Sequence, residues 1–572
     1  MKVIVPSAKL ISPELQNIGK IPAIIYPINQ NISFDFFKLK YEAIASEIDI
    51  ICYENVEKVR EKLSNYKLKT NVNLLKLERL DDLGHSVYRG LTDEDDDIII
   101  HFADTIIMDH LPFDKADFIC TAKEYLSETW TFYNSYNGKF NFINDKKTPS
   151  SPFIDKSIKY DFFIGLFKIS NGSYFKKCLE TVWKNPLKDM DSFYSALMLY
   201  SNDYKFHSYE LQDWFDIGHS QKYFETRMQV EARTFNHIEI DKDRGILKKT
   251  SKDVEKFIGE IKWYLKLPTD IEYVRPRIFS YSLNYNQPYV CMEYYSYRTL
   301  HELFLYAELS GEQWESIFKK IKFVLDDFSR YKLKDDKLNV ALKSMYLDKT
   351  LNRLNKLRDQ SEFINLFKEP ICINEKFYLS LNEIFKILEK IIPQMLYDVD
   401  TFSIIHGDFC FPNIMIDDNL KFIKLIDPRG KFGKYDIYGD PRYEIAKLLH
   451  SIEGKYDFII KNLFSLEILE ENHFNLKILE SSRPFDLLEI FISVFQDNLK
   501  ENIKTVRLIE ALLFLSMIPM HKESIDHQYA MLCTGVKLLN EVTNIITPPL
   551  DTCIIFVVKA FLLLKWQVLY NE

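Results

Sequence analysis

The chain has 572 residues, too many for one hydrophobic core, so we expect two to four domains. Apolar residues at 47% and charged residues at 27% are typical of a soluble globular protein. With a net charge of −9, the chain lacks the basic field of most nucleic-acid binders. Its eight cysteines include no C-x-x-C pair that would indicate zinc or a redox site. We therefore expect a cytoplasmic protein with reduced thiols that does not bind nucleic acid.

Residues 1–228 alternate short apolar strands with helices. Strands are predicted at 48–53 and 98–104, and an amphipathic helix at 56–66 follows the first of them. Continuous apolar strands between helices are typical of a mostly parallel α/β sheet covered on both faces. Asp104 stands at the end of the 98–104 strand, where an open sheet places its ligand chemistry.

A second carboxylate, Asp216, precedes a tight turn at Gly218 and a helix. Mg²⁺ prefers a few protein oxygens together with the phosphate oxygens of a nucleotide. Two carboxylates that converge from separate strands would suit this preference, so Asp104 and Asp216 are a candidate Mg²⁺ site for a nucleotide.

Four motifs in this order resemble those of a sugar-phosphate nucleotidyltransferase. They are the opening strand with residues 19–22, the helix start at 83–86, the strand end at 102–105 and the turn at 214–218. The resemblance implies a Rossmann-like nucleotidyltransferase domain over residues 1–228, with Asp104 and Asp216 as metal ligands. It also implies a nucleoside triphosphate as cofactor, for which we expect CTP.

The loop after the first strand departs from that family. Such enzymes carry a Gly-rich loop with a basic residue there, whereas residues 6–11 contain no glycine, and Ala23 replaces an expected lysine. Lys9 and Lys20 could bind the nucleotide phosphates by charge, but without the geometry of backbone amides. The alternative is an inactive scaffold or binding module with the same fold.

Residues 229–298 predict a small lobe that opens with a hairpin over 234–251 and continues with a helix over 253–265. Leu247 and Lys249 share one face of the second strand by the two-residue period, and the intervening lysine faces outward.

A polar loop follows an apolar run near residue 405. It contains His406, Asp408 and Asn413, and a short hairpin over 414–426 then returns Asp427 to the neighbourhood of Asn413. Phosphoryl transfer needs one carboxylate near the attacking hydroxyl and further oxygens for Mg²⁺. The other interpretation, a surface loop with a stray acidic cluster, does not explain the complete spacing.

This loop resembles the catalytic loop of the aminoglycoside phosphotransferase and choline kinase family, which has a two-lobed α+β protein-kinase-like fold. The resemblance implies that Asp408 is the catalytic base, that Asn413 and Asp427 hold Mg²⁺, and that His406 braces the loop. ATP is then the phosphoryl donor.

The small lobe of such a fold needs a strand lysine for the phosphates and a helix glutamate that holds it. We choose Lys249 as that catalytic and nucleotide-binding lysine, and Glu260 rather than Glu255 as its partner. Met292 and Glu293, at the end of a strand before a polar turn, are the candidates that read adenine.

Residues 299–572 predict a helical large lobe, with helices over 300–306, 312–331 and 377–395. Asp440 is expected to cap a further helix. Residues 345–350, residues 435–436 and Arg429 are candidates for the acceptor site. The apolar run 554–566 is expected to be a docked C-terminal helix or, alternatively, an interfacial helix in peripheral contact with a membrane.

Together these features predict a bifunctional enzyme. A kinase would phosphorylate a hydroxyl of a sugar, polyol or amino alcohol, and a nucleotidyltransferase would convert the product into an NDP-activated precursor of capsule or other surface polysaccharide. The alternative keeps the kinase and makes residues 1–228 a scaffold. The sequence is compatible with a monomer or an oligomer.

Overall fold

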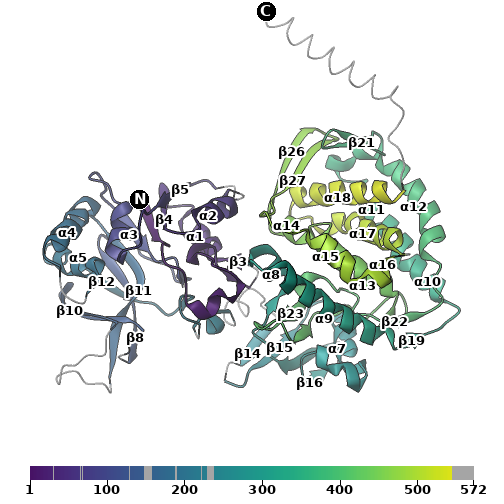
Figure 1. Ribbon diagram of the computed structural model, residues 1–572, viewed down its shortest axis with the longest axis horizontal. Helices are drawn as coiled ribbons and strands as arrows, with labels where there is room; N and C mark the ends of the chain where they lie inside the picture. Colours follow the sequence, from purple (N-terminus) through teal and green to yellow (C-terminus); the bar gives the residue numbers. More distant parts are fainter. Residues whose placement is uncertain are drawn as a thin grey trace, which may run out of the picture. The chain divides into compact units, whose positions relative to one another are not determined.

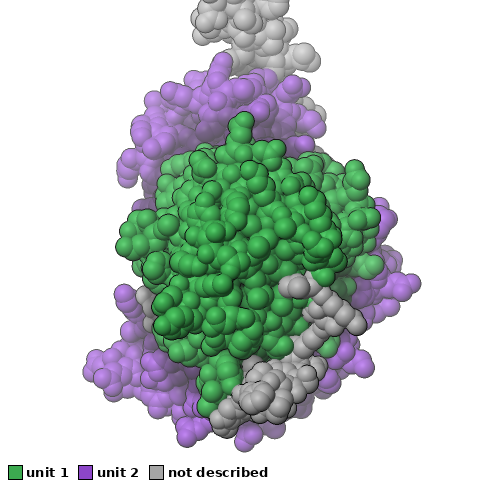
Figure 2. Space-filling view, turned by 90° about the vertical axis from the view of Figure 1, so that its left-hand side faces the viewer, with its two compact units in different colours: residues 1–236, 306–308 green, residues 237–305, 309–572 purple. Residues whose placement is uncertain are grey.

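The computed structural model describes residues 1–572 except 30, 65, 67, 126, 128, 147–157, 187–189, 221, 228–237, 242, 501 and 544–572. The chain divides into two compact units, Met1–Asn236 with Tyr306–Glu308 and His237–Leu305 with Leu309–Glu572 (Figure 2). This division falls eight residues after the expected first domain, which ended at residue 228.

The first unit is built on a nine-stranded sheet (Figure 1). Its parallel strands are β6 (Ile98–His101), β1 (Lys2–Pro6), β4 (Glu47–Cys52) and β5 (Asn71–Lys76), in that spatial order. Beyond β6 follows the long antiparallel strand β11 (Lys159–Ile169), which pairs with β9 (Thr131–Tyr136) and β8 (Phe118–Tyr125). β10 (Lys139–Asp145) pairs with β9, and β12 (His207–Glu210) lies parallel to β8.

The expectation of a mostly parallel sheet was therefore wrong, and the sheet is mixed. β9 and β10 form a hairpin, which joins antiparallel strands without the crossover helix that a parallel pair requires. The α/β class itself is confirmed, because helices alternate with the parallel strands in the first half of the unit.

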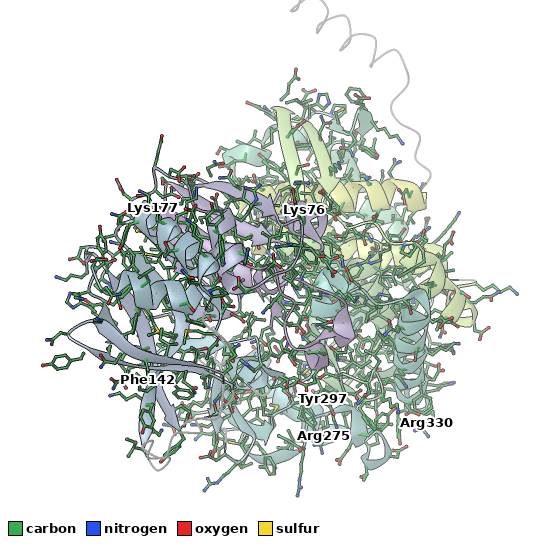
Figure 3. All side chains as sticks on the ribbon, turned by 60° about the vertical axis from the view of Figure 1, so that its left-hand side comes forward. Lys76, Phe142, Lys177, Arg275, Tyr297 and Arg330 are labelled. Atoms are coloured by element: carbon green, nitrogen blue, oxygen red, sulfur yellow. The ribbon has the colours of Figure 1, made fainter. Side chains whose placement is uncertain are left out.

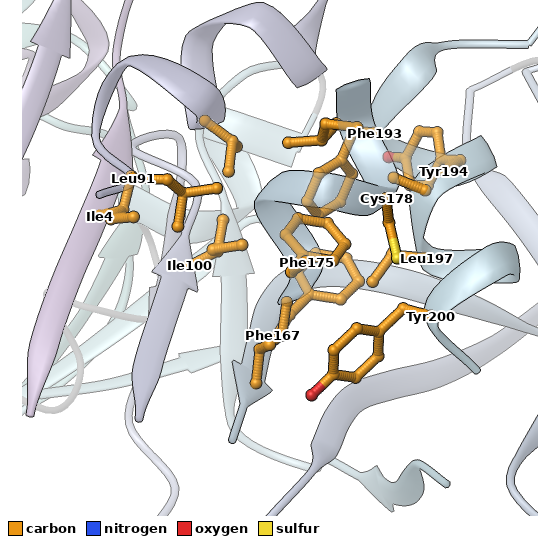
Figure 4. Packing of buried hydrophobic residues seen from close by; sticks show 14 of the residues in the cluster. Ile4, Leu91, Ile100, Phe167, Phe175, Cys178, Phe193, Tyr194, Leu197 and Tyr200 are labelled. Carbon is orange, nitrogen blue, oxygen red and sulfur yellow. The ribbon is translucent and has the colours of Figure 1, made fainter. Parts of the chain in front are cut away.

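Three helices pack on one face of this sheet around a large apolar core (Figure 4). They are α3 (Leu83–Arg89), α4 (Gly172–Lys184) and α5 (Ser192–Tyr200). Ile4 and Ile100 from the central strands and Phe167 from β11 lie in this core with Phe175 and Phe193 from the helices, all fully buried.

On the other face α1 (Ser33–Tyr41) lies against the strands, where the Phe37 ring is 4.4 Å from that of His101. α2 (Val56–Leu63) follows β4, as predicted. Short elements complete the unit: 3-10 turns at Pro13–Ile18 and Ala23–Ile25, and the strand pairs β2 (Pro27–Ile28) with β3 (Asn31–Ile32) and β7 (Thr105–Ile107) with β13 (Trp214–Asp216).

The second unit begins with an antiparallel four-stranded sheet in the order β14 (Ile238–Asp241), β15 (Ile246–Thr250), β17 (Tyr289–Glu293), β16 (Ile278–Ser282). The helix α7 (Val254–Lys266) begins after Asp253, whose side chain caps it, and a 3-10 turn at Thr269–Val274 follows. The predicted hairpin and helix are confirmed. Lys248 faces outward and pairs with Glu239, whereas Lys249 is buried.

The rest of this unit is mainly helical (Figure 1). Its α-helices are α8 (Leu300–Tyr306), α9 (Gly311–Ser329), α10 (Leu338–Leu342), α11 (Lys349–Asn355), α12 (Leu381–Leu396), α13 (Pro441–Ile452), α14 (Tyr456–Ile460), α15 (Leu487–Val494), α16 (Gln496–Leu499), α17 (Ile503–Met517) and α18 (Ile525–Thr543). Two three-stranded sheets lie among them: β18 (Arg298–Thr299), β23 (Ile414–Ile416) and β24 (Ile423–Leu425), and β19 (Lys332–Leu333), β22 (Phe402–Ile404) and β25 (Tyr438–Gly439).

A further sheet corrects the all-helical expectation for this part. Its order is β21 (Lys376–Tyr378), β20 (Ile371–Ile373), β27 (His473–Ile478), β26 (Phe464–Glu470). The helix predicted from residue 377 begins instead at Leu381, because Ser380 and Glu383 form a capping box that fixes its start.

Charged side chains such as those of Lys177 on α4 and Arg330 after α9 are exposed on the surface (Figure 3). The described part of the chain contains no helix whose length and hydropathy match a membrane-spanning segment. The apolar run 554–566 lies outside the described residues.

Candidate functional site

In the first unit, the short strand pair β7–β13 brings Asp104 and Asp216 together. Asp104 directly precedes β7, and Asp216 lies opposite Thr105 in the antiparallel register. A Cβ on Gly218 would lie 2.7 Å from Asp104 Oδ2 and 3.3 Å from Asp216 Oδ1, so both carboxylates crowd the same glycine. The structure thus places the two predicted metal ligands side by side.

Asp104 borders a cleft of about 380 Å³, and Asp216 lies next to this cleft through its contacts with Gly218 and His219. Asp104, Gly218 and His219 line it, as do residues of the loop after β1 and the start of α3. Asp216 Oδ1 accepts a hydrogen bond from the Gly218 N–H at 2.7 Å, and its Oδ2 lies 2.5 Å from His219 Nδ1. The carboxyl ends of β1 and β6 therefore carry the cleft, as expected for an open α/β sheet.

The electrostatics of this cleft suit a cation. Burial, followed by the charge of Asp216, raises the pKa of Asp104 to about 6. The hydrogen bond to Asp216 raises the pKa of His219. A bound divalent cation would relieve the repulsion between two neighbouring carboxylates, so this pair fits Mg²⁺.

Of the two predicted phosphate-binding lysines, the cleft lining includes only Lys9. Lys20 is exposed, and its backbone carbonyl accepts hydrogen bonds from Asn55 and Lys58. Sequence analysis missed Lys146, which also lines the cleft. Burial and Asp216 have the larger effects and raise the pKa of Asp104, whereas the charge of Lys146 lowers it. Its position after a hairpin strand offered no motif.

In the second unit, Lys249 joins the small sheet to the loop that carries Asp427. Lys249 Nζ lies 2.8 Å from Glu260 Oε1 of α7 and 2.6 Å from Asp427 Oδ1. Burial would lower the pKa of Lys249, but Asp427 and Glu260 outweigh it and hold this pKa above its usual range. Glu255, the alternative helix partner, instead pairs with Lys431 at the surface.

The loop after β22 is held by a buried hydrogen-bond network. Glu444 of α13 accepts the backbone N–H groups of His406 and Gly407, at 2.7 Å and 3.0 Å. His406 Nε2 lies 3.0 Å from the carbonyl of Ile426, to which it donates, and burial lowers the pKa of His406 to about 4. A neutral His406 therefore ties the loop to the strand before Asp427.

Asp408 and Asn413 are joined within this loop. Asn413 Nδ2 donates to the Asp408 carbonyl at 2.8 Å and to Asp408 Oδ2 at 3.2 Å. Because both partners are acceptors, the amide nitrogen must face them, and Asn413 Oδ1 is left to face a cation. Asp427 has a left-handed backbone with φ of 56°. Asn413 and Asp427 thus offer the neutral and charged oxygens that Mg²⁺ takes beside phosphate oxygens.

Sequence analysis missed Lys447, whose Nζ lies 2.8 Å from Asp408 Oδ1. Partial burial would raise the pKa of Asp408, but Lys447 outweighs it and holds that pKa well below its usual range. Asp408 is therefore ionised at neutral pH. Lys447 lies two turns after Asp440, the confirmed cap of α13. A lysine among the mostly buried residues of this helix was the signal that could have identified it, because a buried lysine usually has a charged partner.

The two adenine candidates lie at the end of β17. Met292 is buried and lies opposite Leu247 in the neighbouring strand β15. The Glu293 N–H already donates to the Arg277 carbonyl at 2.8 Å, and this group is not free for a ligand.

No family model matches the chain, and no curated protein is similar to it. Solved structures with a similar N-terminal part cover about two fifths of the chain. They include UDP-glucose pyrophosphorylase with UDP-glucose, at 14% identity and a TM-score of 0.34, covering 41% of this chain and 98% of that one. The inositol-1-phosphate CTP transferase of T. maritima has 12% identity and a TM-score of 0.30, covering 40% and 96%. The nucleoside-diphosphate-sugar pyrophosphorylase of Vibrio cholerae RC9 has 15% identity and a TM-score of 0.32, covering 40% and 100%.

Proposed function

We propose that the second unit transfers the γ-phosphoryl group of ATP to a hydroxyl of a small molecule such as a sugar or polyol. The observation that carries this proposal is the set of contacts at Lys249. One buried ammonium group touches Glu260 and Asp427, residues far apart in sequence, next to the loop of Asp408 and Asn413. An ion pair with a purely structural role would need only Glu260. The second carboxylate, Asp427, comes from the segment that is hydrogen-bonded to Asn413.

In this proposal Lys249 binds the α- and β-phosphates, and Glu260 fixes its position. Asn413 and Asp427 would hold Mg²⁺, which supplies charge neutralisation for the phosphates when it is bound. Asp408 accepts the proton of the acceptor hydroxyl while that oxygen forms its bond to the γ-phosphorus. The bond between the γ-phosphorus and the bridging oxygen breaks, and ADP leaves.

Because the pKa of Asp408 is low, Asp408 is a weak base. Its main contribution is to orient the hydroxyl toward the γ-phosphorus and to receive the proton late in the transfer. Lys447 lies where it can stabilise both Asp408 and the negative charge that develops on the transferring group.

We propose that the first unit transfers a nucleotidyl group from a nucleoside triphosphate to a phosphorylated small molecule. The specific observation in favour is the pair of carboxylates at Gly218, where Asp104 lines a cleft. Asp104 and Asp216 would hold Mg²⁺, and Lys9 and Lys146 would contact the phosphates. The acceptor phosphate oxygen then attacks the α-phosphorus, and pyrophosphate leaves.

Joined in one chain, the two reactions would make an NDP-activated building block, of the kind used for surface polysaccharide. The experiment supplies the full-length protein with ATP, CTP and a panel of free and phosphorylated sugars and polyols, and follows ADP and pyrophosphate separately. We expect ADP from a free hydroxyl compound and pyrophosphate from its phosphorylated product.

Absence of ADP with every acceptor would refute the kinase. Absence of pyrophosphate with every nucleoside triphosphate and phosphorylated acceptor would instead favour the scaffold alternative for the first unit.

A further inference from the structure

Four cationic side chains from three segments form one cluster, and three of them, Lys349, Arg429 and Lys447, interact with Asp408. Lys447 of α13 is the nearest, at 2.8 Å. Lys349 and Arg353 lie one turn apart on α11, and Arg429 follows the Asp427 loop. Sequence analysis had considered residues 345–350 and Arg429 for the acceptor site, but neither Arg353 nor Lys447.

Individual contacts connect these cations to the catalytic loop and to α13. Lys349 Nζ lies 5.9 Å from the centre of the Tyr443 ring, and Tyr443 precedes Lys447 by one turn of α13. The Arg429 N–H donates to the His406 carbonyl at 2.9 Å. The Cβ of Arg429 is 3.0 Å from the Cβ position of Gly407, the residue before Asp408.

The positive charge of this cluster is not balanced by protein. The cluster of four cations has Asp408 as its carboxylate neighbour, and neither Lys349 nor Arg429 forms an ion pair with any residue that the structure describes. Arg353 donates to the Ser516 carbonyl at 3.3 Å. Desolvated like charges repel, and such an arrangement is stabilised when an anion lies among them.

Burial, together with Arg429, Arg353 and Lys447, lowers the pKa of Lys349 well below its ordinary value. The backbone at this point is also unusual. Lys349 directly follows a π-helical segment, Lys343–Asp348, between α10 and α11. π-helical turns are rare and occur often at functional sites, where they change the direction of side chains.

We propose that the acceptor of the phosphotransferase already carries an anionic group, a phosphate monoester or a carboxylate, which Lys349, Arg353 and Arg429 bind. This inference rests on the proposed kinase function and names its substrate class. The acceptor hydroxyl must lie within hydrogen-bond reach of Asp408, so the cationic groups next to Asp408 are placed to contact the rest of the acceptor.

Arg353 and Arg429 suit this role because guanidinium groups bind phosphate and carboxylate in a bidentate manner. The same cluster excludes acceptors whose only charge is positive. An amino alcohol without an acidic group would add a fifth cation around one carboxylate, which is unfavourable.

The first test is a turnover screen with matched acceptors. Glycerol 3-phosphate and glucose 6-phosphate represent phosphate monoesters, glucuronate represents carboxylates, glycerol and glucose are the neutral parents, and choline and glucosamine are cationic. With MgATP and the full-length protein, we expect ADP from an anionic compound at least 100-fold faster than from its neutral parent. The phosphate and carboxylate arms identify which anion is bound.

The second test measures binding without turnover. Inorganic phosphate is titrated into the full-length protein with MgADP, and both calorimetry and thermal stability are followed. We expect phosphate to raise the melting temperature of the wild type, and the double variant Arg353→Gln/Arg429→Gln to bind phosphate at least tenfold more weakly. Lys356→Gln is the matched control, since it removes an exposed cation from the end of the same helix.

Lys349→Met provides a readout that does not need the acceptor. Loss of one cation from a repelling cluster should raise the melting temperature of the ligand-free protein and reduce the rise that phosphate causes. If Lys349→Met instead lowers the melting temperature of the ligand-free protein, Lys349 is a structural residue and the inference is overturned.

The outcomes separate the inference from the function on which it rests. ADP formation from neutral or cationic acceptors only, with phosphate binding equal in the double variant and wild type, overturns the anionic acceptor and leaves the kinase. Absence of ADP with every acceptor overturns both.

Discussion

The contact between Lys249 and Glu260 gives the sharpest test of the nucleotide site proposed for the second unit. Their side chains are 11% and 8% exposed, and the atoms lie 2.8 Å apart. Glu260→Gln keeps the shape of the side chain and one acceptor oxygen but removes the charge. Burial raises the pKa of Glu260 and Lys249 opposes that rise, so the charged form depends on this partner.

The expected loss of stability in Glu260→Gln depends on which partners Lys249 keeps. Removal of one partner of a buried ion pair typically costs about 3–5 kcal/mol. Lys249 keeps Asp427 at 2.6 Å, and we therefore expect a loss of about 2 kcal/mol in the free energy of unfolding of the second unit. Lys249 would also shift toward Asp427, so kcat/KM for ATP should fall roughly tenfold to a hundredfold.

The matched control is Glu255→Gln on the same helix. Glu255 and its partner Lys431 have side chains that are 77% and 56% exposed, at 3.0 Å. An exposed pair contributes about 0–1 kcal/mol, so this variant should retain both its stability and its kcat/KM for ATP.

Calorimetric melting of the full-length proteins gives the stability comparison, and a coupled assay for ADP gives the kinetics. Equal effects of Glu260→Gln and Glu255→Gln would refute the assignment of Glu260. A larger effect of Glu255→Gln would transfer the role to that residue.

Further predictions address the other groups. Asp408→Asn should lower ADP formation by roughly 10²–10⁴ with nearly unchanged ATP binding, and normal turnover of a folded variant would contradict the role of Asp408. Asp427→Ala should abolish turnover and weaken MgATP binding together, and Mg²⁺ titration checks this, because an unaltered Mg²⁺ dependence excludes Asp427 as a ligand. Asp104→Ala should stop pyrophosphate release and leave ADP formation intact, whereas loss of both products would mean that the two reactions depend on one site. Burial lowers the pKa of His101 to about 3 from 6.5, so the unfolded chain binds a proton that the folded unit does not, and stability falls as pH decreases from 6.5 toward 3. At pH 5 this loss is about 2 kcal/mol, and the stability of His101→Gln should vary less between pH 7 and 5, as melting at each pH would show.

The local pattern of the chain was sufficient for the elements that carry short-range signals. The two-residue period of a strand placed Lys249 inward and Lys248 outward, and capping residues marked the helices that begin after Asp253 and Asp440. The hairpin between Asn413 and Asp427 also followed from apolar runs around a polar turn. Each of these features depends on neighbours within a few residues, which sequence analysis can read.

Some signals were local but were missed. The alternation of apolar and polar residues in β26 was visible, yet the helical periodicity on both sides led to an all-helical expectation. The mixed sheet of the first unit was not visible in the same way. β6 is a continuous apolar strand that pairs parallel with β1 and antiparallel with β11, and its sequence does not distinguish the two edges.

The sequence by itself therefore determined that Asp408, Asn413 and Asp427 lie close together, because one loop and one hairpin connect them. Only the tertiary structure decided what surrounds them. Lys447 reaches Asp408 from a helix that begins 33 residues later, and Lys349 joins it through packing against Tyr443. Such contacts depend on how helices pack at long sequence separation, and no local period encodes that geometry.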